Sequence, residues 1–543
     1  MMSNWNLLLP ILIAMAAPSF PSGLPQQTYK AGELLSSWKD GGRLSTYHNG
    51  LFYMIGMHKS FVWDISNPKS PVLKKEGAGF NGHRWAKFGN AFWKEYELSD
   101  AIPTGYNFLD LSALPELAPY KGSAKIPLQG DQPTLNSLWT YPHREGGTGL
   151  IDVRTGASVG AIRPSGLKTV NAGNTLRIGN LWFFCPGDNQ TGVAVVDVGN
   201  PANPKILAEL KGDYKQYTTT YQVWRHYLIL IIGDDTNVGG NNLIAIDFRN
   251  PTDLKVAWSY PTSLIKGMRY MMFKDEFGFG GRGDEGLKIN LETGQVVQRY
   301  KVTDYFASDF QWIPLGHLLV QTASENCVSC GSQTHIFALQ DSLDNRPPKV
   351  DYHLPKDGAL NQPLGTVVGL VIAETLDDVT INDKTVLVRP VGGAPVTADV
   401  VSYSYNVVNI APRSPLLPNT TYEVEVVGGG IKDVAGNGIV SKKFYFSTGS
   451  TLNAPLGSPF TAGEKAAGGL LRREIRGTTL TLRSGLPGPW RASFADMRGK
   501  VHTLLPAVSG AISVPVGGWA RGLHTVILTS EKGRVIREKV LIP

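Results

Sequence analysis

Residues 193–204 read VAVVDVGNPANP, an apolar run that ends in an aspartate and is followed by an Asn-Pro turn. Two further strand signals, residues 175–178 and 181–185, precede this run, and a third, residues 205–210, follows it. Gly, Asn or Pro residues separate each signal from the next. Four short strands joined by tight turns predict one antiparallel sheet.

The same pattern recurs along the first 346 residues. An aspartate or its substitute closes an apolar run seven times, at spacings of 46, 42, 45, 50, 43 and 50 residues. A period of this length with several strands per unit is typical of β-propellers, whose blades are four-stranded sheets. The sequence therefore predicts a seven-bladed propeller. The closing positions are Asp64, Asp110, Asp152, Asp197, Asp247, Asn290 and Gln340.

The seventh unit has no fourth strand of its own, because residues 341–348 are turn-like. The segment before the first unit resembles a fourth strand. Pairing the two would remove two exposed sheet edges. We expect residues 27–40 to complete the seventh blade.

The repeated aspartates have a structural explanation. Asp64, Asp197 and Asp247 each begin an Asp-x-x-Asn-Pro turn. The carboxylate can accept backbone N–H groups of such a turn, and proline fixes the backbone after it. We expect turn stabilisation from these interchangeable residues, not catalysis.

The composition agrees with an all-β protein. The chain of 543 residues contains 61 Gly and 35 Pro, and only 18% of its residues are charged. This composition excludes a coiled coil, a disordered chain and a long-helix protein.

The net charge of +7 is confined to one end of the chain. Residues 469–543 hold 12 Lys/Arg and 4 Asp/Glu, a balance of +8, so the other residues together carry −1. No nucleic-acid motif accompanies this charge, and we expect no nucleic-acid partner.

The N-terminus has the pattern of an export signal. Residues 7–17 form an apolar run of 11, too short for a bilayer, and small residues suited to signal peptidase lie near its end. A buried first strand is the alternative. We expect residues 1–17 to be a signal peptide, no transmembrane span, and an extracellular or outer-membrane-surface location.

The motif of apolar run, Asp, Asn-Pro and outer strand resembles the LVIVD-repeat propellers of bacterial surface and secreted proteins. The resemblance covers residues 27–346 and is closest at residues 197–204. It implies a propeller without a settled biochemical activity.

Two further modules follow. Residues 347–449 contain short strands and the motifs LLPNTTYEVEV, KDVAGN and FST. They resemble bacterial Ig-like domains of the surface-layer type, which are β-sandwiches. Asp433 and Asn437 lie in the second motif, where a turn-stabilising role is expected and Ca²⁺ binding is the alternative. We otherwise expect no metal and no cofactor.

Residues 450–468 are rich in Gly, Ser, Ala and Pro and predict a linker. Residues 469–543 then show strand signals, an Asp-x-x-Gly-Lys motif, an Arg-Gly-Leu turn and a final strand at the end of the chain. They resemble the C-terminal sorting domain of type IX secretion substrates, which implies a small β-sandwich that meets the secretion machinery. A third adhesion sandwich is the alternative.

Cys327 and Cys330 form a CxxC in a polar loop between two apolar strands. No second CxxC completes a zinc site, and no βαβ setting supports a redox motif. We expect a local disulfide between Cys327 and Cys330 that stabilises the loop.

The loops before each first strand and the hairpins between second and third strands share one face of a propeller. In this chain they combine aromatic residues with Arg, Asp and Asn, which suits a sugar or a protein ligand; ordinary solvated loops are the alternative. The predicted ligand-binding residues are His83, Arg84, Trp85, Tyr217, Tyr221, Arg269, Tyr270 and Asp309.

Linear enzyme motifs give no support to catalysis. A GxSxG match at residues 156–160 and a GxGxxG match at residues 278–283 lie within predicted blades, where no helix follows. The sequence therefore favours a secreted or cell-surface binding and adhesion protein over an enzyme. If the protein is instead an extracellular glycan-active enzyme, Asp234 and Asp284 are the acid/base candidates.

Overall fold

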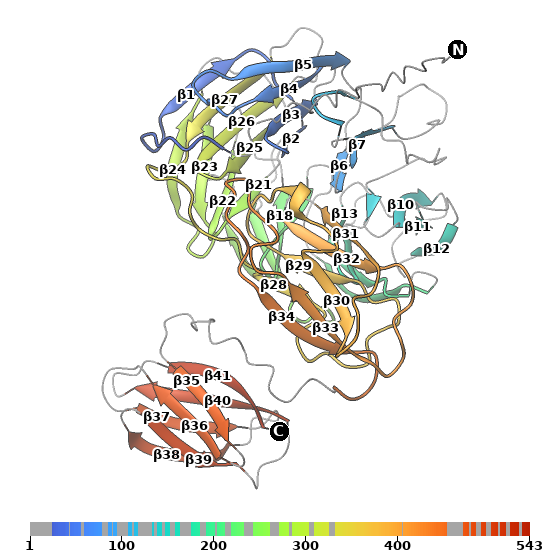
Figure 1. Ribbon diagram of the computed structural model, residues 1–543, viewed down its shortest axis with the longest axis vertical. Coiled ribbons are helices and arrows are strands. Elements are labelled where there is room, and N and C mark those ends of the chain that lie inside the picture. Colours follow the sequence, from blue (N-terminus) through green and yellow to red (C-terminus); the bar gives the residue numbers. More distant parts are fainter. Residues whose placement is uncertain are drawn as a thin grey trace, which may run out of the picture. The chain divides into compact units, whose positions relative to one another are not determined.

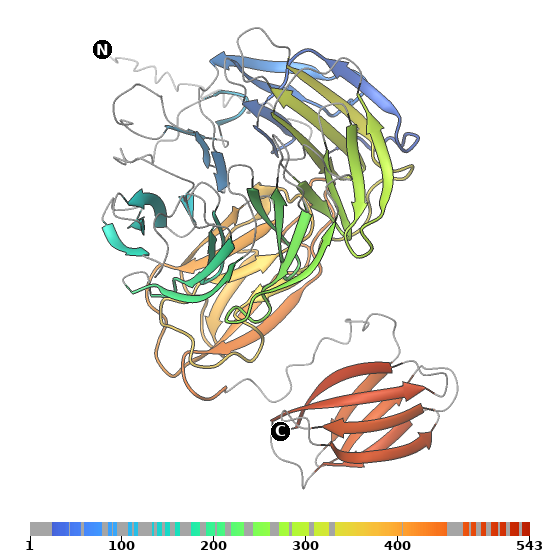
Figure 2. The ribbon, with the colours of Figure 1, turned by 180° about the vertical axis from the view of Figure 1, so that it is seen from behind.

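The computed structural model places the chain as two compact units, Met1–Ala454 and Pro455–Pro543 (Figures 1 and 2). Each is described by itself. The residues described are 24–42, 44–55, 59–78, 85–88, 91–94, 107–110, 113–117, 133–134, 138–143, 147–152, 158–162, 175–184, 192–200, 203–211, 219–232, 243–260, 271–281, 285–302, 309–324, 332–403, 406–452, 471–476, 479–484, 490–495, 501–508, 511–516, 522–530 and 535–542.

The protein is all-β, as predicted, and no α-helix occurs in these described ranges. Seven repeat units follow one another, and six of them form four-stranded antiparallel sheets consistent with propeller blades. The first four units, in chain order, comprise β2 (Leu44–His48), β3 (Leu51–Ile55), β4 (Lys59–Asp64) and β5 (Val72–Ala78); β6 (Trp85–Phe88), β7 (Ala91–Lys94) and β8 (Asn107–Asp110); β9 (Pro133–Thr134), β10 (Leu138–His143), β11 (Gly147–Asp152) and β12 (Ser158–Ile162); β13 (Thr175–Ile178), β14 (Leu181–Phe184), β15 (Gly192–Asp197) and β16 (Lys205–Lys211).

The last three units have the same strand order. They comprise β17 (Thr219–Trp224), β18 (Tyr227–Ile232), β19 (Leu243–Asp247) and β20 (Lys255–Tyr260); β21 (Met271–Lys274), β22 (Phe277–Gly281), β23 (Glu285–Asn290) and β24 (Val296–Lys301); and β25 (Asp309–Leu315), β26 (Leu318–Ser324) and β27 (Gln333–Ala338), joined by β1 (Leu34–Trp38).

The N-terminal strand completes the seventh sheet. β1 pairs antiparallel with β27, so the sheet order is β1-β27-β26-β25. This confirms the prediction that the N-terminal segment supplies the missing fourth strand. Its residues Tyr29 and Leu35 join a core that also contains Ile336 of the seventh unit and Trp63 of the first.

A β-bulge marks the outermost strand in six of the seven units. The register between third and fourth strands shifts by one residue at equivalent positions, and β1 carries the same shift between Leu34 and Ser36. A bulge twists the free edge of a sheet and hinders edge-to-edge pairing. The shared bulge shows that β1 is equivalent to a fourth strand supplied by another part of the chain.

The repeated aspartates act as predicted. Asp64, Asp197 and Asp247 end the third strands, and in each case Oδ1 accepts the backbone N–H two residues later, over 2.8–3.0 Å. Asn290 accepts two such N–H groups in the sixth unit. These side chains hold the turn to the fourth strand.

The Ig-like domain forms two sheets around a core that includes Tyr422, Phe444 and Phe446. One sheet is β28-β29-β32-β31 and continues through a single residue pair, Tyr403 with Phe88, into β6-β7-β8; the other is β30-β33-β34. The elements are β28 (Tyr352–Leu354), β29 (Val368–Val371), a 3-10 turn η3 (Asp378–Thr380), β30 (Val386–Pro390), β31 (Ala398–Tyr403), β32 (Val407–Pro412), β33 (Thr421–Val426) and β34 (Lys442–Ser447).

The second unit contains a three-stranded sheet, β35-β36-β39, and a four-stranded sheet, β38-β37-β40-β41. Leu480, Phe494 and Val514 are buried in it. The strands are β35 (Leu471–Arg476), β36 (Thr479–Ser484), β37 (Trp490–Ala495), β38 (Val501–Val508), β39 (Ala511–Pro515), β40 (Gly522–Ser530) and β41 (Val535–Ile542).

The segment between the repeats and the Ig-like domain is anchored by a buried residue, although most of residues 341–347 are exposed. The sequence predicts turns over residues 341–348, and within them Asp344 is 7% exposed and bonded to Lys274 of β21. The repeats and the Ig-like domain therefore form one compact unit.

Truncation of Leu35 tests the placement of β1. Leu35 is 9% exposed and its neighbour Leu34 is 49% exposed. Leu35→Ala should lower the free energy of unfolding by about 2–5 kcal/mol, because a buried Leu loses its core contacts. Leu34→Ala, the matched control, should cost less than about 0.5 kcal/mol. Urea unfolding measures both; equal losses would contradict the burial of this strand.

Limited proteolysis tests the division of the chain. We expect the first cut between the two units, within residues 453–470, because few contacts cross a domain boundary. The larger fragment should keep the repeats and the Ig-like domain together. Mass spectrometry identifies the ends, and an equally early cut within residues 339–351 would show that the junction is open.

Candidate functional site

Most of the predicted ligand-binding residues lie outside the described residues. This holds for His83, Arg84, Tyr217, Arg269 and Tyr270. It also holds for the acid/base candidates Asp234 and Asp284, for Cys327 and Cys330, and for the predicted signal peptide at residues 1–17. Their roles remain predictions.

The backbone of the other three ligand-binding candidates is placed. Trp85 and Asp309 are the first residues of β6 and β25, and Tyr221 lies within β17. All three strands are the first strands of their units. Trp85 and Asp309 therefore share one end of the repeat units, the end at which the first strands begin.

The opposite end of the units meets the Ig-like domain. We call it the hairpin face, because it consists of the hairpins between first and second strands and the turns that follow third strands. In both ribbon views the orange strands of the Ig-like domain lie against the green strands of the central units (Figures 1 and 2). The Ig-like domain contacts the hairpin face at the first, fourth, fifth, sixth and seventh units.

Two asparagines of the Ig-like domain satisfy backbone groups at strand ends. Asn409 of β32 accepts the N–H of Gly179 and donates to the carbonyl of Arg177. Asn406 donates to the carbonyl of Val223 over 2.6 Å. Both asparagines are buried, and a buried polar group must find such partners. The contact is thus specific to the geometry of the hairpins.

Glycines allow the two domains to approach closely at the fourth unit. Gly179 has a φ of +56°, and a Cβ on Gly369 of β29 would lie 2.3 Å from the Gly179 nitrogen. Only residues without a side chain fit at this distance. A larger residue at position 369 would push the domain away from the hairpin.

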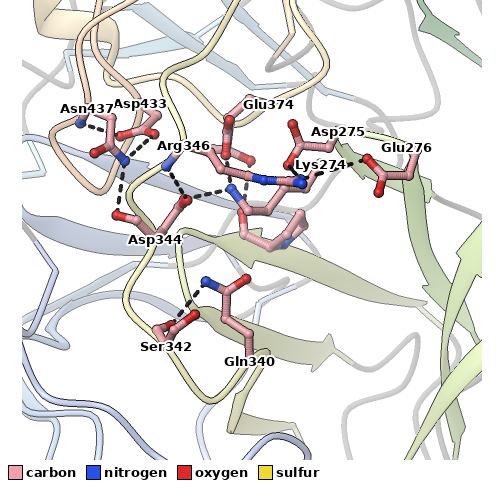
Figure 3. Close-up of polar contacts among 12 residues, drawn as sticks. Lys274, Asp275, Glu276, Gln340, Ser342, Asp344, Arg346, Glu374, Asp433 and Asn437 are labelled. Atoms are coloured by element: carbon pink, nitrogen blue, oxygen red, sulfur yellow. Dashed lines mark hydrogen bonds and ion pairs between the residues drawn. The ribbon is translucent and has the colours of Figure 1, made fainter. Parts of the chain in front are cut away.

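A buried ionic group connects the sixth unit, the junction segment and the Ig-like domain (Figure 3). Lys274, at the end of β21, donates to Asp344 over 2.6 Å and also to Glu374. The three side chains are 5%, 1% and 4% exposed. Asp433 lies beside them, and one carboxylate oxygen from each acid falls within 4.8 Å of the others. We call Lys274, Asp344, Glu374 and Asp433 the Lys274 cluster.

The pKa values in this cluster follow from burial and charge. Burial works to lower the pKa of Lys274, but the Glu374 and Asp344 carboxylates outweigh it and hold this pKa above its ordinary value. Burial raises the pKa of Glu374 to about 8, with Lys274 opposing the rise and Asp344 adding to it. Burial also raises the pKa of Asp433, against hydrogen bonds from Asn437. Lys274 therefore stays charged at neutral pH.

Asp433 and Asn437 stabilise a turn, as expected. Asn437 donates its backbone N–H and its side-chain amide to the two carboxylate oxygens of Asp433, over 2.8 and 2.9 Å. The same amide donates to the carbonyl of Asp344 over 3.1 Å. This turn thereby also contacts the junction segment.

The Lys274 cluster suits structural attachment more than catalysis. Its members are buried, and the space beside Glu374 is a cavity of about 10 Å³, the size of one water molecule. The sequence contains one signal for this cluster, because Lys274 follows the apolar run of residues 271–273 at the end of a strand. A charged residue at such a position needs a buried partner.

The enzyme-like motifs lie in sheets. Ser158 of the GxSxG match is the first residue of β12, an outer strand, and Gly278 and Gly280 of the GxGxxG match lie in β22. A nucleophile elbow and a dinucleotide loop both need a following helix, and β12 and β22 are strands of antiparallel sheets.

Two family models match parts of the chain. The bacterial Ig-like domain model matches residues 344–448, and the LVIVD repeat model matches residues 61–76 and 183–214, which span the third and fourth strands of the first and fourth units. Both matches are consistent with a surface-associated binding protein. Within the described part of the chain, no helix has the length and apolarity to cross a membrane.

No curated protein matches the chain. Among solved structures, the chain is similar to the computationally designed Ika8 protein, with 10% identity and a TM-score of 0.34 over 56% of this chain and 98% of that one.

Replacement of Lys274 tests the attachment role of the cluster. Lys274→Met leaves three buried carboxylates without their cation, so it should lower the free energy of unfolding by about 3–5 kcal/mol. The control is Lys255→Met, since Lys255 forms an exposed ion pair with Asp253 and should contribute at most about 1 kcal/mol. Urea unfolding at neutral pH measures both. Similar small losses would show that Lys274 is not the essential cation.

Proposed function

We propose that the protein is an extracellular binding protein in which seven LVIVD-like units close into a propeller. The Ig-like domain occupies its hairpin face, and the opposite face takes an extracellular glycan or protein ligand. Adhesion at the cell surface is the role that this arrangement fits best.

The main support for a closed propeller is that the Ig-like domain contacts six of the seven units. One domain of about 100 residues reaches the ends of first strands in the first, fourth, fifth, sixth and seventh units, and pairs with β6 of the second. A single domain of this size spans about 25–30 Å. The strand ends of these units must therefore converge, as they do around the axis of a ring.

Contacts between neighbouring units support the same ring. Gln311 of β25 accepts the N–H of Ser45 in the first unit, which joins the seventh unit to the first. Gln222 of β17 accepts the N–H of Met271 in the same way between the fifth and sixth units. Lys75 of β5 pairs with Glu116, which follows the third strand of the second unit.

The free face is the one that the sequence assigns to the ligand. Trp85 and Asp309 begin first strands at the end remote from the Ig-like domain, and the sequence that precedes first strands contains further candidates, including Arg84, Tyr217 and Tyr270. Aromatic rings stack on sugar faces, and the planar fork of Arg suits hydroxyl or carboxylate groups. With the hairpin face covered, a ligand has this face available.

The ends of the chain fit an exported protein. Residues 1–17 have the pattern of a signal peptide, and residues 469–543 carry the surplus positive charge within the second compact unit. We propose that this unit meets the type IX secretion machinery, as its resemblance to sorting domains implies. The attached first unit would then be displayed outside the cell.

Binding of glycans and matrix proteins to an array tests the ligand face. If the face binds a glycan, Tyr217→Ala and Tyr270→Ala should each weaken binding by roughly tenfold or more, because aromatic anchors dominate such sites. Tyr260→Ala is the control, since the Tyr260 hydroxyl bonds to Leu291 in the outer part of the sheets. All variants should keep the circular dichroism spectrum of the parent.

A glycan-active enzyme is the alternative, and measurement of glycan turnover beside binding distinguishes it. Asp234→Asn or Asp284→Asn would then stop turnover and leave binding nearly unchanged, because an amide keeps the shape of a carboxyl group but cannot act as acid or base. Unchanged behaviour of all four face variants would exclude both ligand hypotheses. The face would then be better described as a platform for a protein partner.

A further inference from the structure

We propose that the second compact unit binds an acidic polysaccharide on one face of its sheet β35-β36-β39 (Figure 1). The ligand is a polymer of sugars that carry carboxylate or sulfate groups. The proposal goes beyond the function proposed above, because it depends neither on what the free face of the repeats binds nor on contact with the secretion machinery.

Burial distinguishes the two faces of this sheet. Leu480 of β36 and Val514 of β39 are 0% and 3% exposed, and they are direct partners in the strand register. The register is continuous in both strand pairs of the sheet, and successive residues of a strand lie on opposite faces. Thr481, Arg483 and Ser513 therefore lie on the face opposite to the buried one. We call this opposite face the outer face.

Two arginines are direct partners on the outer face. The register of β35 with β36 pairs Arg472 with Arg483, two positions away from the pair of Glu474 with Thr481. The Cβ atoms of direct partners lie about 4.5–5.5 Å apart, and like charges placed directly opposite each other destabilise a sheet. A negative group bound between two such arginines removes their repulsion. The pair therefore fits a position at which one acid group of a ligand binds.

The positive charge extends along the sheet. Arg476 lies on the same face of β35, four residues beyond Arg472, which corresponds to about 13 Å in an extended strand. Glu474 lies between them, so the outer face has three arginines and one glutamate at its strand positions. A small anion reaches one end of this row, whereas a polymer with repeated acid groups reaches both ends. The charge distribution therefore favours a polyanion.

The uncharged positions of the outer face indicate which class of polyanion it suits. Single-stranded nucleic acids bind where aromatic rings stack on bases, and membranes and protein partners bind where large apolar residues are exposed. Among the strand residues of β35, β36 and β39, the outer face has neither kind of residue. Hydroxyl-bearing residues beside arginines instead suit the hydroxyl and acid groups of a sugar polymer. The uncharged positions are Thr479, Thr481, Ala511, Ser513 and Pro515.

The charge of the whole unit supports the same ligand. Residues 469–543 hold 12 Lys/Arg and 4 Asp/Glu, and a net positive charge attracts a polyanion from a distance. Salt screens this attraction, so binding should weaken as the salt concentration rises. The planar guanidinium group also binds an acid group through two parallel hydrogen bonds. Binding should therefore depend on where the arginines are, and not only on the net charge.

The test measures binding of the full-length protein to three immobilised polymers by surface plasmon resonance in about 0.15 M salt. Heparin is sulfated, polygalacturonate is carboxylated, and dextran is neutral, so the three show which acid group is bound. The outer-face variant carries Arg472→Gln and Arg483→Gln. The matched control variant carries Arg491→Gln and Arg537→Gln, which remove the same charge from the other sheet, β38-β37-β40-β41.

We expect the parent to bind heparin, polygalacturonate or both, and not dextran. The outer-face variant should bind roughly tenfold or more weakly than the control variant, because it loses charge-assisted hydrogen bonds as well as charge. Equal weakening of the two variants would overturn the proposal, and so would an absence of binding to both acidic polymers. Tighter binding to duplex DNA or to phosphatidylglycerol vesicles in the same buffer would also overturn it.

Two further variants keep the outcome unambiguous. Should the outer-face variant fail to fold, Arg472→Lys replaces it: lysine keeps the charge but lacks the planar fork, so binding must weaken, and unchanged binding would contradict the proposal. Tyr217→Ala changes only the ligand face of the repeats and should bind the acidic polymers as the parent does. Loss of their binding in Tyr217→Ala, with the outer-face variant unaffected, would assign them to the repeats and overturn the proposal.

Discussion

The docking of the Ig-like domain on the hairpin face is the constraint that organises the first compact unit. Gly179, Val223, Asp275 and Pro314 lie near the ends of four first strands, and each is hydrogen-bonded to this one domain. Because the domain is small, these strand ends must lie close together. The arrangement of the repeats and the choice of a free face both follow from this contact.

The contact combines apolar packing with buried polar groups, and the polar groups decide how specific it is. Asn406 and Asn409 complete hydrogen bonds that the hairpins leave open, and Gly369 admits the close approach. Apolar surfaces tolerate small shifts, whereas buried hydrogen-bonding groups lose about 1–3 kcal/mol when a partner is misplaced. The domain therefore docks in one position on the repeats. This position also buries the charged groups of the Lys274 cluster, whose charges must balance one another.

The repeat architecture could be predicted from the sequence because its signals are local. The aspartates at the ends of third strands and the strands of the unit at residues 175–211 were placed nearly to the residue, since apolar runs and Asn-Pro turns are read within a few positions. The role of β1 could also be predicted, because the sequence of the seventh unit contains no fourth strand of its own.

Attachment of the Ig-like domain was not predictable in the same way. Lys274 and Glu374 are 100 residues apart, and neither stands in a motif. The sequence shows that Lys274 interrupts an apolar run, but not which carboxylate meets it. The junction has no apolar pattern in the sequence, and the contacts that anchor it are made by Asp344 and by backbone groups. For the ligand face, the sequence identifies candidate residue types. The fold shows only at which end of the repeat units the placed candidates Trp85 and Asp309 lie.

Hydrogen exchange at two backbone amides tests the central claim most directly. The N–H groups of Gly179 and Asp275 belong to hairpin turns, which ordinarily exchange fast, and here they donate to Asn409 and Ala373 of the Ig-like domain. In the intact chain at neutral pH, the account predicts that both amides exchange as slowly as those of the neighbouring strands β13 and β21. Exchange at the rate of exposed loop amides would show that the Ig-like domain does not cover the hairpin face.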